Sequence, residues 1–356
     1  MAQNIIAFII VLSVLILVHE LGHFLVARLF GVGVERFSLG FGPRVAGKTV
    51  GITDYRLSAI PLGGYVKMIG DEPDSEVPPE DAHLAFNYKP LYKRFLIVAA
   101  GPFSNFVLAV VIFLGLFLAT GIPVVNPVIG KIDPGSPASH AGIQPKDRIL
   151  TIDGKSMDSW EAMSDAITSS KGHELSMTVS RSGHIVDIHV TPTKQSAKNI
   201  FGESAERYVI GVMSSGESHI RKLTVSEAVS ESLIQTYRIA ELTALSVVKM
   251  IEGTVSTKTL GGPIMIAEMA GQQAREGAAS FVFFIALLSI NLGILNFLPI
   301  PVLDGGHLFF FLIEAIIRRP LSMRAQELAQ QAGIAVLVLL MILVFYNDIH
   351  RIFFAG

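Results

Sequence analysis

Three ionisable side chains stand within five residues of one another at the end of a long apolar run. His19, Glu20 and His23 form the pattern H-E-x-x-H inside the stretch "LILVHELGHFLVA". A spacing of four residues places both imidazoles on one helix face, where they can share a metal ion. Zinc fits best, because it takes nitrogen and oxygen ligands tetrahedrally and a catalytic site keeps one position for water. We expect Glu20 to be the general base toward that water, whose pKa zinc lowers to about 7.

A chance match of five residues, or a pair of structural polar residues, is the alternative interpretation. Charged side chains in the middle of a membrane helix cost about 2.5 to 3.5 kcal/mol each on insertion scales. A cluster kept at that cost needs a partner or a function, so the apolar surroundings favour the metal site.

A catalytic zinc site needs a third protein ligand, which must also lie at membrane depth. The stretch "NLGILNFLPIPVLDGGHL" offers Asp304, which closes the third apolar segment. Two prolines just before it break the helix, and irregular backbone at this depth is tolerated only inside protein or around a watery cavity. Asp304 is the predicted third ligand. An aspartate that caps the next helix is the alternative, and His307 is a rival ligand.

Asn291 and Asn296 belong to the same stretch. Their amides could donate hydrogen bonds to a substrate carbonyl or a developing oxyanion. Ordinary hydrogen bonding between membrane helices explains them equally well. The residues alone leave both interpretations open.

The composition indicates a membrane protein. Of the 356 residues, 51% are hydrophobic and only 16% are charged, which is too apolar for an ordinary soluble domain. A net charge of −2 gives no basic field that would attract nucleic acid, and we expect no nucleic-acid partner. The chain has no cysteine, which excludes disulfides, thiol catalysis and cysteine zinc fingers.

Four segments are long enough to cross the roughly 30 Å hydrocarbon core of a bilayer. The first lacks a basic leading region and a small-residue cleavage site, so we interpret it as a retained helix rather than a signal peptide. The four predicted segments are residues 1–18, 95–119, 278–303 and 328–346.

Loop charges predict the orientation of these segments. Residues 28–94 carry nine Lys and Arg, and the short third loop carries Arg318, Arg319 and Arg324. The positive-inside rule therefore places both loops in the cytoplasm and both termini outside. The long second loop, about residues 121–277, then also lies outside.

H-E-x-x-H in the first segment, followed by N-x-x-P-x-P-x-L-D-G in the third, resembles the site-2 protease family of intramembrane zinc metalloproteases, peptidase family M50. The long insert matches the bacterial RseP type best, and "GPFSNF", residues 101–106, is similar to the family's second-segment motif. The resemblance implies zinc as the cofactor and a role for each matching residue. The implied acid/base is Glu20, the zinc ligands are His19, His23 and Asp304, and the substrate-positioning residues are Asn291 and Asn296.

Between the first two segments, "FSLGFGPRV" and "DYRLSAIPLGGYVKMIGDE" read as hairpin strands. In the family that they resemble, such strands form a sheet near the active site, and its edge could pair with an extended substrate. A hairpin that only covers the cytoplasmic face is the alternative.

The insert contains "VIGKIDPGSPASHAGIQPKDRILTIDGKSM", which resembles a bacterial PDZ domain. A helix over residues 160–169 and strands near 174–179 and 184–190 would complete it. Lys146 and Asp147 stand where that family usually has Gly-Asp. PDZ domains bind extended peptides by strand addition, so a peptide or a trimmed substrate end is a predicted partner. A size filter and a purely structural insert are the alternatives.

We therefore expect a multi-pass α-helical membrane protein with four transmembrane helices, a membrane-associated β-hairpin region and an inserted α+β PDZ domain. The predicted regions are residues 1–120 (two helices and the hairpin region), 121–194 (PDZ domain), 195–277 (linker and amphipathic helix) and 278–356 (the last two helices).

The predicted function is intramembrane zinc endopeptidase activity in the bacterial inner membrane, with the active site toward the cytoplasm. Expected substrates are single-span membrane proteins such as anti-sigma factors, or remnant signal peptides. A metal-ion transporter is disfavoured because the second and fourth segments hold few polar residues. An inactive PDZ tether is disfavoured because Glu20 and all three proposed ligands are intact.

Overall fold

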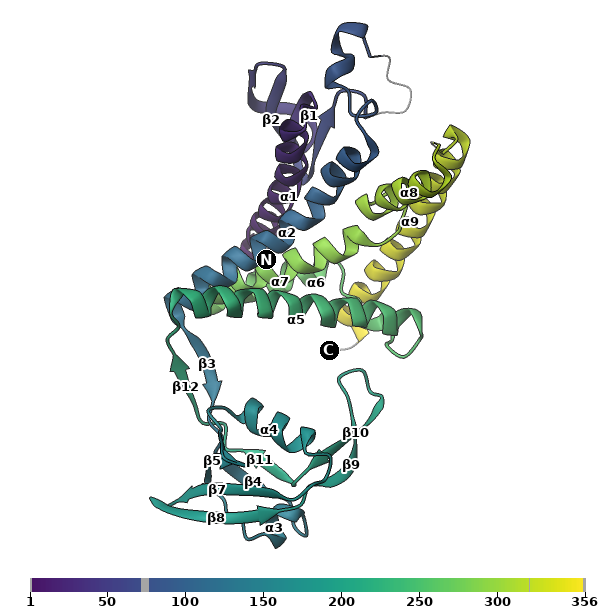
Figure 1. The fold of residues 1–356 in the computed structure, drawn as a ribbon. Helices are drawn as coiled ribbons and strands as arrows, with labels where there is room; N and C mark the ends of the chain where they lie inside the picture. The colour runs from purple at the N-terminus through teal and green to yellow at the C-terminus, as the bar shows by residue number, and fades with distance from the viewer. Residues whose placement is uncertain (1, 72–76, 320, 355–356) are drawn as a thin grey trace. The chain divides into compact units, whose positions relative to one another are not determined.

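Four helices are long and apolar enough to cross a membrane in the part of the chain that the structure describes. Each of the four predicted segments falls on one of them, and the 20 residues of the shortest span about 30 Å at 1.5 Å per residue. They are α1 (Ala2–Leu29), α2 (Leu91–Thr120), α7 (Ala278–Phe297) and α9 (Met323–Phe354) (Figure 1).

The computed structural model describes residues 2–71, 77–319 and 321–354. Met1 and residues 355–356, which belong to the first and last predicted regions, lie outside the described residues. The chain forms two compact units. The first comprises residues 1–116, 229–248 and 256–356, and the second comprises residues 117–228 and 249–255.

The third predicted segment extends six residues beyond the end of the helix in the structure. α7 ends at Phe297 instead of continuing to residue 303, because the prolines at 299 and 301 cannot continue a helix. The chain turns and resumes as α8 (Asp304–Ile317). The turn packs tightly on the start of α8, where a Cβ on Gly305 would lie 2.2 Å from the carbonyl oxygen of Leu298.

Strands β1 (Val34–Val50) and β2 (Thr53–Met68) form the predicted hairpin region between α1 and α2. Residues 36–39 of β1 have partners on both sides, at 54–57 and at 64–67 of β2. Residues 64–68 are therefore an edge of this sheet, and no further strand pairs with them in the described chain. In Figure 1 the hairpin lies beside α1.

The core of the first unit joins α1 to α6 (Pro263–Glu276) and α7. Val11 and Leu15 of α1 pack with Ala270 of α6 and Phe284 of α7. The remaining helices of this unit are the short η1 (Pro79–Leu84) and η2 (Thr257–Thr259) and most of the predicted amphipathic helix α5 (Val225–Ile251).

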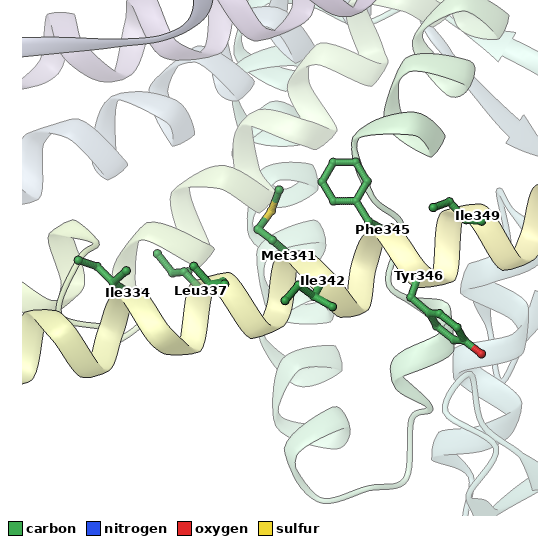
Figure 2. A pocket seen from close by; sticks show the side chains of 8 residues that line it. Ile334, Leu337, Met341, Ile342, Phe345, Tyr346 and Ile349 are labelled. Atoms are coloured by element: carbon green, nitrogen blue, oxygen red, sulfur yellow. The ribbon is translucent and has the colours of Figure 1, made fainter.

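One face of α9 is apolar along several turns. Figure 2 shows the side chains that line a shallow pocket on this helix. Most of them are exposed in the protein alone, which suits a helix that contacts lipid acyl chains. They are Ile334, Leu337, Val338, Met341, Ile342, Phe345, Tyr346 and Ile349.

The second unit is built on a four-stranded antiparallel sheet in the order β6-β5-β7-β8. Met163 and Ile167 of α4 (Trp160–Ser169) pack with the strand residues Ile149 and Met177 in its core. The predicted helix and strands are thus present. The elements are α3 (Pro137–His140), β5 (Arg148–Ile152), β6 (Lys155–Ser156), β7 (Leu175–Arg181) and β8 (His184–Val190).

Strands continue beyond residue 194, where the predicted domain ended. That boundary falls inside the hairpin of β9 (Thr193–Lys198) and β10 (Ser204–Val209). The chain then returns to its start: β11 (Val212–Ser214) pairs with β4 (Ile129–Ile132), and β12 (Ser218–Arg221) pairs with β3 (Ile122–Val125). The compact unit accordingly reaches residue 228.

Lys146 adopts a left-handed backbone conformation with φ 74° just before the buried Asp147. The carboxylate of Asp147 accepts hydrogen bonds from Nε and Nη2 of Arg181, at 2.8 and 2.7 Å, so this turn is held in place. A residue with a Cβ is strained in that conformation and glycine is not. We expect Lys146→Gly to stabilise the second unit by about 1 kcal/mol. Thermal unfolding of the full chain tests this, with Lys146→Ala as the control that should gain nothing.

Candidate metal centre

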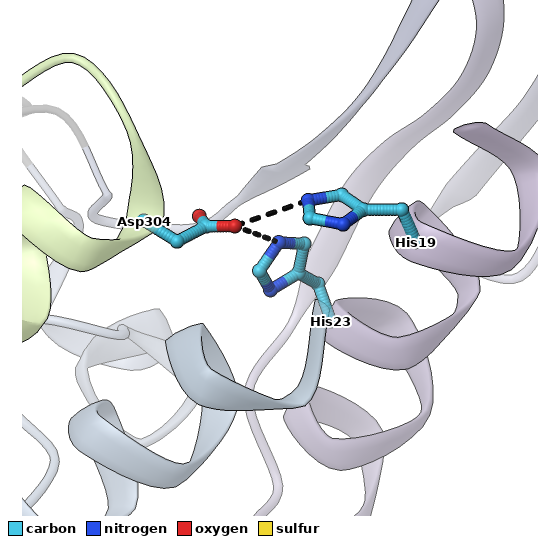
Figure 3. Close-up of side chains that lie close together, drawn as sticks. All are labelled: His19, His23 and Asp304. Atoms are coloured by element: carbon cyan, nitrogen blue, oxygen red, sulfur yellow. Dashed lines mark ion pairs between the residues drawn. The ribbon is translucent and has the colours of Figure 1, made fainter. Parts of the chain in front are cut away.

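His19, His23 and Asp304 meet at one point, although the sequence separates them by up to 285 residues. Figure 3 shows the carboxylate of Asp304 directed at both imidazoles. Its Oδ2 lies 3.0 Å from Nε2 of His19 and 3.5 Å from Nε2 of His23. One ligand atom from each residue lies within 4.8 Å of the other two, and all three side chains are largely shielded.

Helix geometry supplies the positions of the three side chains. The i, i+4 spacing places both histidines on the buried face of α1. Asp304 is the first residue of α8, where the positive end of the helix dipole favours a carboxylate. It does not cap that helix, since the cap residue is Leu303 and makes no side-chain capping bond. Arg94 of α2 binds Glu314 of α8 at 2.5 Å and thereby ties α8 to α2.

The ring nitrogens of the two histidines that face away from Asp304 are held by α2. Nδ1 of His23 lies 2.9 Å from the carbonyl oxygen of Ile97. Nδ1 of His19 lies 3.1 Å from Nδ2 of Asn105, a fully buried side chain. Neither contact was predicted from the sequence, although an amide within an apolar segment, four residues after Gly101, was a signal that a partner was needed.

The donor set fits a metal cation. A carbonyl oxygen can only accept, so the ring of His23 donates from Nδ1, and a neutral ring then directs the Nε2 lone pair toward Asp304. The carboxylate of Asp304 presents further lone pairs to the same point. Lone pairs that converge in this way repel each other unless a cation lies between them. Two imidazole nitrogens and a carboxylate oxygen form a ligand set that zinc takes in catalytic sites.

Glu20 lies next to the cluster on the side of the β-hairpin. Its carboxylate accepts a hydrogen bond from the backbone N–H of Val66 in β2. It also lies close to Gly64, where an added Cβ would come within 3.3 Å of Cγ of Glu20. Glu20 is therefore held between the histidines and the edge strand of the sheet.

The two predicted substrate-positioning asparagines lie on α7, and the rival ligand His307 is not part of the three-residue cluster in the described chain. Oδ1 of Asn291 accepts a hydrogen bond of 2.8 Å from the hydroxyl of Thr243 on α5. Asn296 is half-buried one residue before the end of α7. His307, the rival ligand, lies one turn into α8 with its ring edge-on to Phe310.

Gly101 allows α2 to approach the centre. A Cβ at this position would lie 2.2 Å from Nε2 of His23, the atom that faces Asp304. We expect Gly101→Ala to displace that imidazole and to lower metal affinity by about 10-fold or more, as for other changes beside metal ligands.

Gly115 on the same helix is the matched control, because a Cβ there meets nothing within 4 Å. Gly115→Ala should leave metal affinity unchanged. Zinc titration of both purified variants tests this expectation. Equal affinities for the two variants would contradict the tight packing of α2 on His23.

Four apolar helices and a buried His2Asp centre define this chain as a membrane protein with a candidate catalytic metal site. Comparison with known proteins identifies the class. The model of peptidase family M50 matches residues 7–340, so the chain belongs to that family, the site-2 proteases. The prediction made from the two motifs is confirmed.

Curated relatives cover almost the whole chain. A protein of Mesorhizobium japonicum named "Putative zinc metalloprotease" is 37% identical over 360 residues, which cover 97% of this chain and 98% of the relative. One of the same name from Agrobacterium fabrum is 38% identical, with 98% and 96% covered. Another from Campylobacter jejuni is 39% identical, with 97% and 93% covered.

The chain is therefore a metalloprotease of the zinc-dependent site-2 type. Its apolar helices and its family fit a protein of the bacterial inner membrane that acts on membrane-embedded substrates.

Proposed function

We propose that the chain hydrolyses peptide bonds within transmembrane segments of single-span membrane proteins, at a zinc ion held by His19, His23 and Asp304. The observation that carries this proposal is the meeting of these three side chains beside Glu20. Zinc bound there would supply Lewis acidity and activate a water molecule.

Glu20 is the residue proposed to move protons. Its carboxylate lies beside the proposed ligands and is oriented by the N–H of Val66. From that position it would take a proton from the attacking water and later deliver one to the leaving amine. The two imidazoles and Asp304 stay in place and hold the metal.

The edge of the hairpin sheet is the proposed docking site for the substrate. A helical peptide hides its carbonyl groups in its own hydrogen bonds, so a transmembrane substrate must unwind before it can be cut. Residues 64–68 are an edge segment, and the same segment contacts Glu20. A substrate strand added there would run past the proposed catalytic carboxylate.

The two asparagines of α7 are proposed to differ in role. Asn296 remains the proposed donor to the substrate backbone, because it lies near the end of α7 that leads to Asp304. Asn291 already bonds Thr243, which supports a role in holding α5 against α7 and weakens the proposal that it binds substrate.

The second unit is proposed to be a PDZ domain that binds a peptide or the trimmed end of a substrate. Its helix α4, its four-stranded sheet and the returning strand β11 support this assignment, and we propose residues 117–228 as its extent. Anti-sigma factors and remnant signal peptides are the proposed substrates. We propose that this unit and both termini lie outside, with the metal centre toward the cytoplasm, from the loop charges.

Reconstitution tests the proposed function. The purified protein, placed in liposomes with a tagged single-span anti-sigma factor, should cut it within the membrane segment. A strong zinc chelator should stop the cut, and added zinc should restore it. Zinc flux without any cleavage would instead support a transporter and contradict the proposal.

A further inference from the structure

One buried amide contacts the proposed metal centre without taking part in the chemistry described so far. Asn105 of α2 is completely buried, and its Nδ2 lies 3.1 Å from Nδ1 of His19. Its Oδ1 has no hydrogen-bond partner in the described chain. Buried amide oxygens are normally paired, so this side chain needs an explanation.

The contact determines which nitrogen of His19 carries the proton. If Asn105 donates from Nδ2, then Nδ1 of His19 must be the acceptor and the proton of a neutral ring lies on Nε2. Nε2 is the atom that faces Asp304 at 3.0 Å. A protonated Nε2 can donate to that carboxylate, but it has no lone pair for a metal.

Metal binding requires the opposite arrangement. A metal at Nε2 leaves the proton on Nδ1, and Nδ1–H then needs an acceptor. The oxygen and nitrogen of a carboxamide have nearly the same size, so a half-turn of the amide presents Oδ1 to His19 in place of Nδ2. The turn exchanges the two amide atoms: Oδ1 gains Nδ1–H of His19 as its partner, and Nδ2 gives up its contact with the ring.

We propose that Asn105 is a positioning residue that accepts a hydrogen bond from Nδ1 of His19 and so keeps Nε2 free for the metal. The inference rests on the proposed zinc site. It gives the two histidines equivalent supports on α2: the carbonyl of Ile97 holds His23, and the carboxamide of Asn105 holds His19.

The backbone around Asn105 is suited to this role. Residues 97, 101 and 105 are spaced by four and lie on one face of α2, which is the face toward the histidines. The hydroxyl of Ser289 on α7 donates a hydrogen bond of 2.8 Å to the backbone carbonyl of Asn105. The backbone of Asn105 is thus held by a hydrogen bond from α7, and its side chain contacts His19.

The proposal is tested by measuring the zinc affinity of the purified full chain in competition with a chromogenic chelator. Two variants of Asn105 are expected to have different effects on this affinity. Asn105→Leu keeps the branched outline of the side chain, although leucine is larger, and it loses the acceptor. It should weaken zinc binding about 10- to 100-fold. Asn105→Asp keeps an acceptor oxygen, and it should bind zinc within about threefold of the wild type, since a carboxylate commonly holds a zinc-bound histidine. A packing role predicts the reverse order, because leucine fills the site and a buried carboxylate does not suit it.

A spectroscopic readout separates the role of Asn105 from a loss of fold. Cobalt(II) in place of zinc should give visible bands that shift in Asn105→Asp, because the carboxylate makes the imidazole of His19 more basic. Gly115→Ala, which changes the same helix at a position where an added Cβ meets nothing within 4 Å, should match the wild type in zinc affinity and spectrum. If Asn105→Leu does not fold, Asn105→Ala takes its place with the same expected loss.

The outcomes distinguish the inference from the proposed function. Wild-type affinity in Asn105→Leu or Asn105→Ala, together with loss of zinc in His23→Ala, would overturn the role of Asn105 and leave the metal site intact. Wild-type affinity in His23→Ala as well would overturn both. Weak binding in the leucine variant with near-normal binding in the aspartate variant is the result that we expect.

Discussion

Glu20→Gln is expected to abolish detectable cleavage while zinc stays bound. Removal of a general acid/base typically costs about 100- to 10,000-fold in rate, and glutamine cannot accept the proton. The amide oxygen of glutamine can still accept the hydrogen bond from Val66, so the side chain should keep its place beside the hairpin edge. Initial rates on a reconstituted single-span substrate measure the loss.

Zinc content is the control for this variant. Glu20 is not in the three-residue ligand cluster, so Glu20→Gln should bind one zinc per chain as the wild type does. Cleavage at more than about a tenth of the wild-type rate would exclude Glu20 as the catalytic base. Loss of zinc together with activity would instead make Glu20 a ligand.

Asp304→Ala is expected to remove both zinc and activity. Changes to groups that merely support a metal ligand cost about 10- to 100-fold in affinity, so loss of one of three direct ligands should cost at least about 100-fold. The remaining pair of imidazoles would lose the carboxylate that now lies 3.0 and 3.5 Å from their Nε2 atoms. Zinc per chain after dialysis against a weak chelator measures the effect.

Glu314→Gln is the matched control on the same helix. It removes the charge that pairs with Arg94 but keeps an oxygen that can accept a hydrogen bond from the guanidinium, so α8 stays tied to α2 and zinc should stay bound. Unchanged zinc content in Asp304→Ala would move the third ligand elsewhere. His307→Ala would then identify the rival, because His307 lies one turn along α8.

The residues of the candidate site could be proposed from the sequence because the two motifs carry their chemistry locally. H-E-x-x-H specifies two imidazoles on one helix face, and a carboxylate after a broken membrane segment is costly without a partner. The residue types therefore follow from the sequence, but the distances between the side chains do not. That Asp304 approaches both histidines depends on how the start of α8 packs against α1 and α2, which only the structure shows.

The two groups of α2 that contact the histidines could not be predicted from local sequence patterns for the same reason. Ile97 contributes a backbone carbonyl, and any residue type has one, so no sequence signal marks it. Asn105 was visible as an amide in an apolar segment, but its partner depends on the alignment of α2 against α1. Sequence motifs therefore indicate the proposed metal ligands more readily than the groups that orient these ligands.

Two predicted bounds differ from the structure, one for a local reason and one because strand pairing is non-local. The third apolar segment was extended across two prolines because composition alone set its limits, and α7 ends before them. Strands β11 and β12 are too short to stand out by alternation, and they are defined by pairing with β4 and β3 about 80 to 100 residues earlier. In contrast, α4 is present as predicted at Trp160–Ser169, since its start signal, Ser159, and its apolar period are local.

Zinc K-edge X-ray absorption of the purified wild-type protein shows directly whether His19, His23 and Asp304 bind a zinc ion. We expect one zinc per chain, with two imidazole nitrogens at about 2.0–2.1 Å and oxygen ligands at about 2.0–2.2 Å. The imidazole contribution should disappear together with the zinc in His23→Ala. A shell with three imidazoles, or a protein that cleaves its substrate with no zinc bound, would contradict a site made of His19, His23 and Asp304.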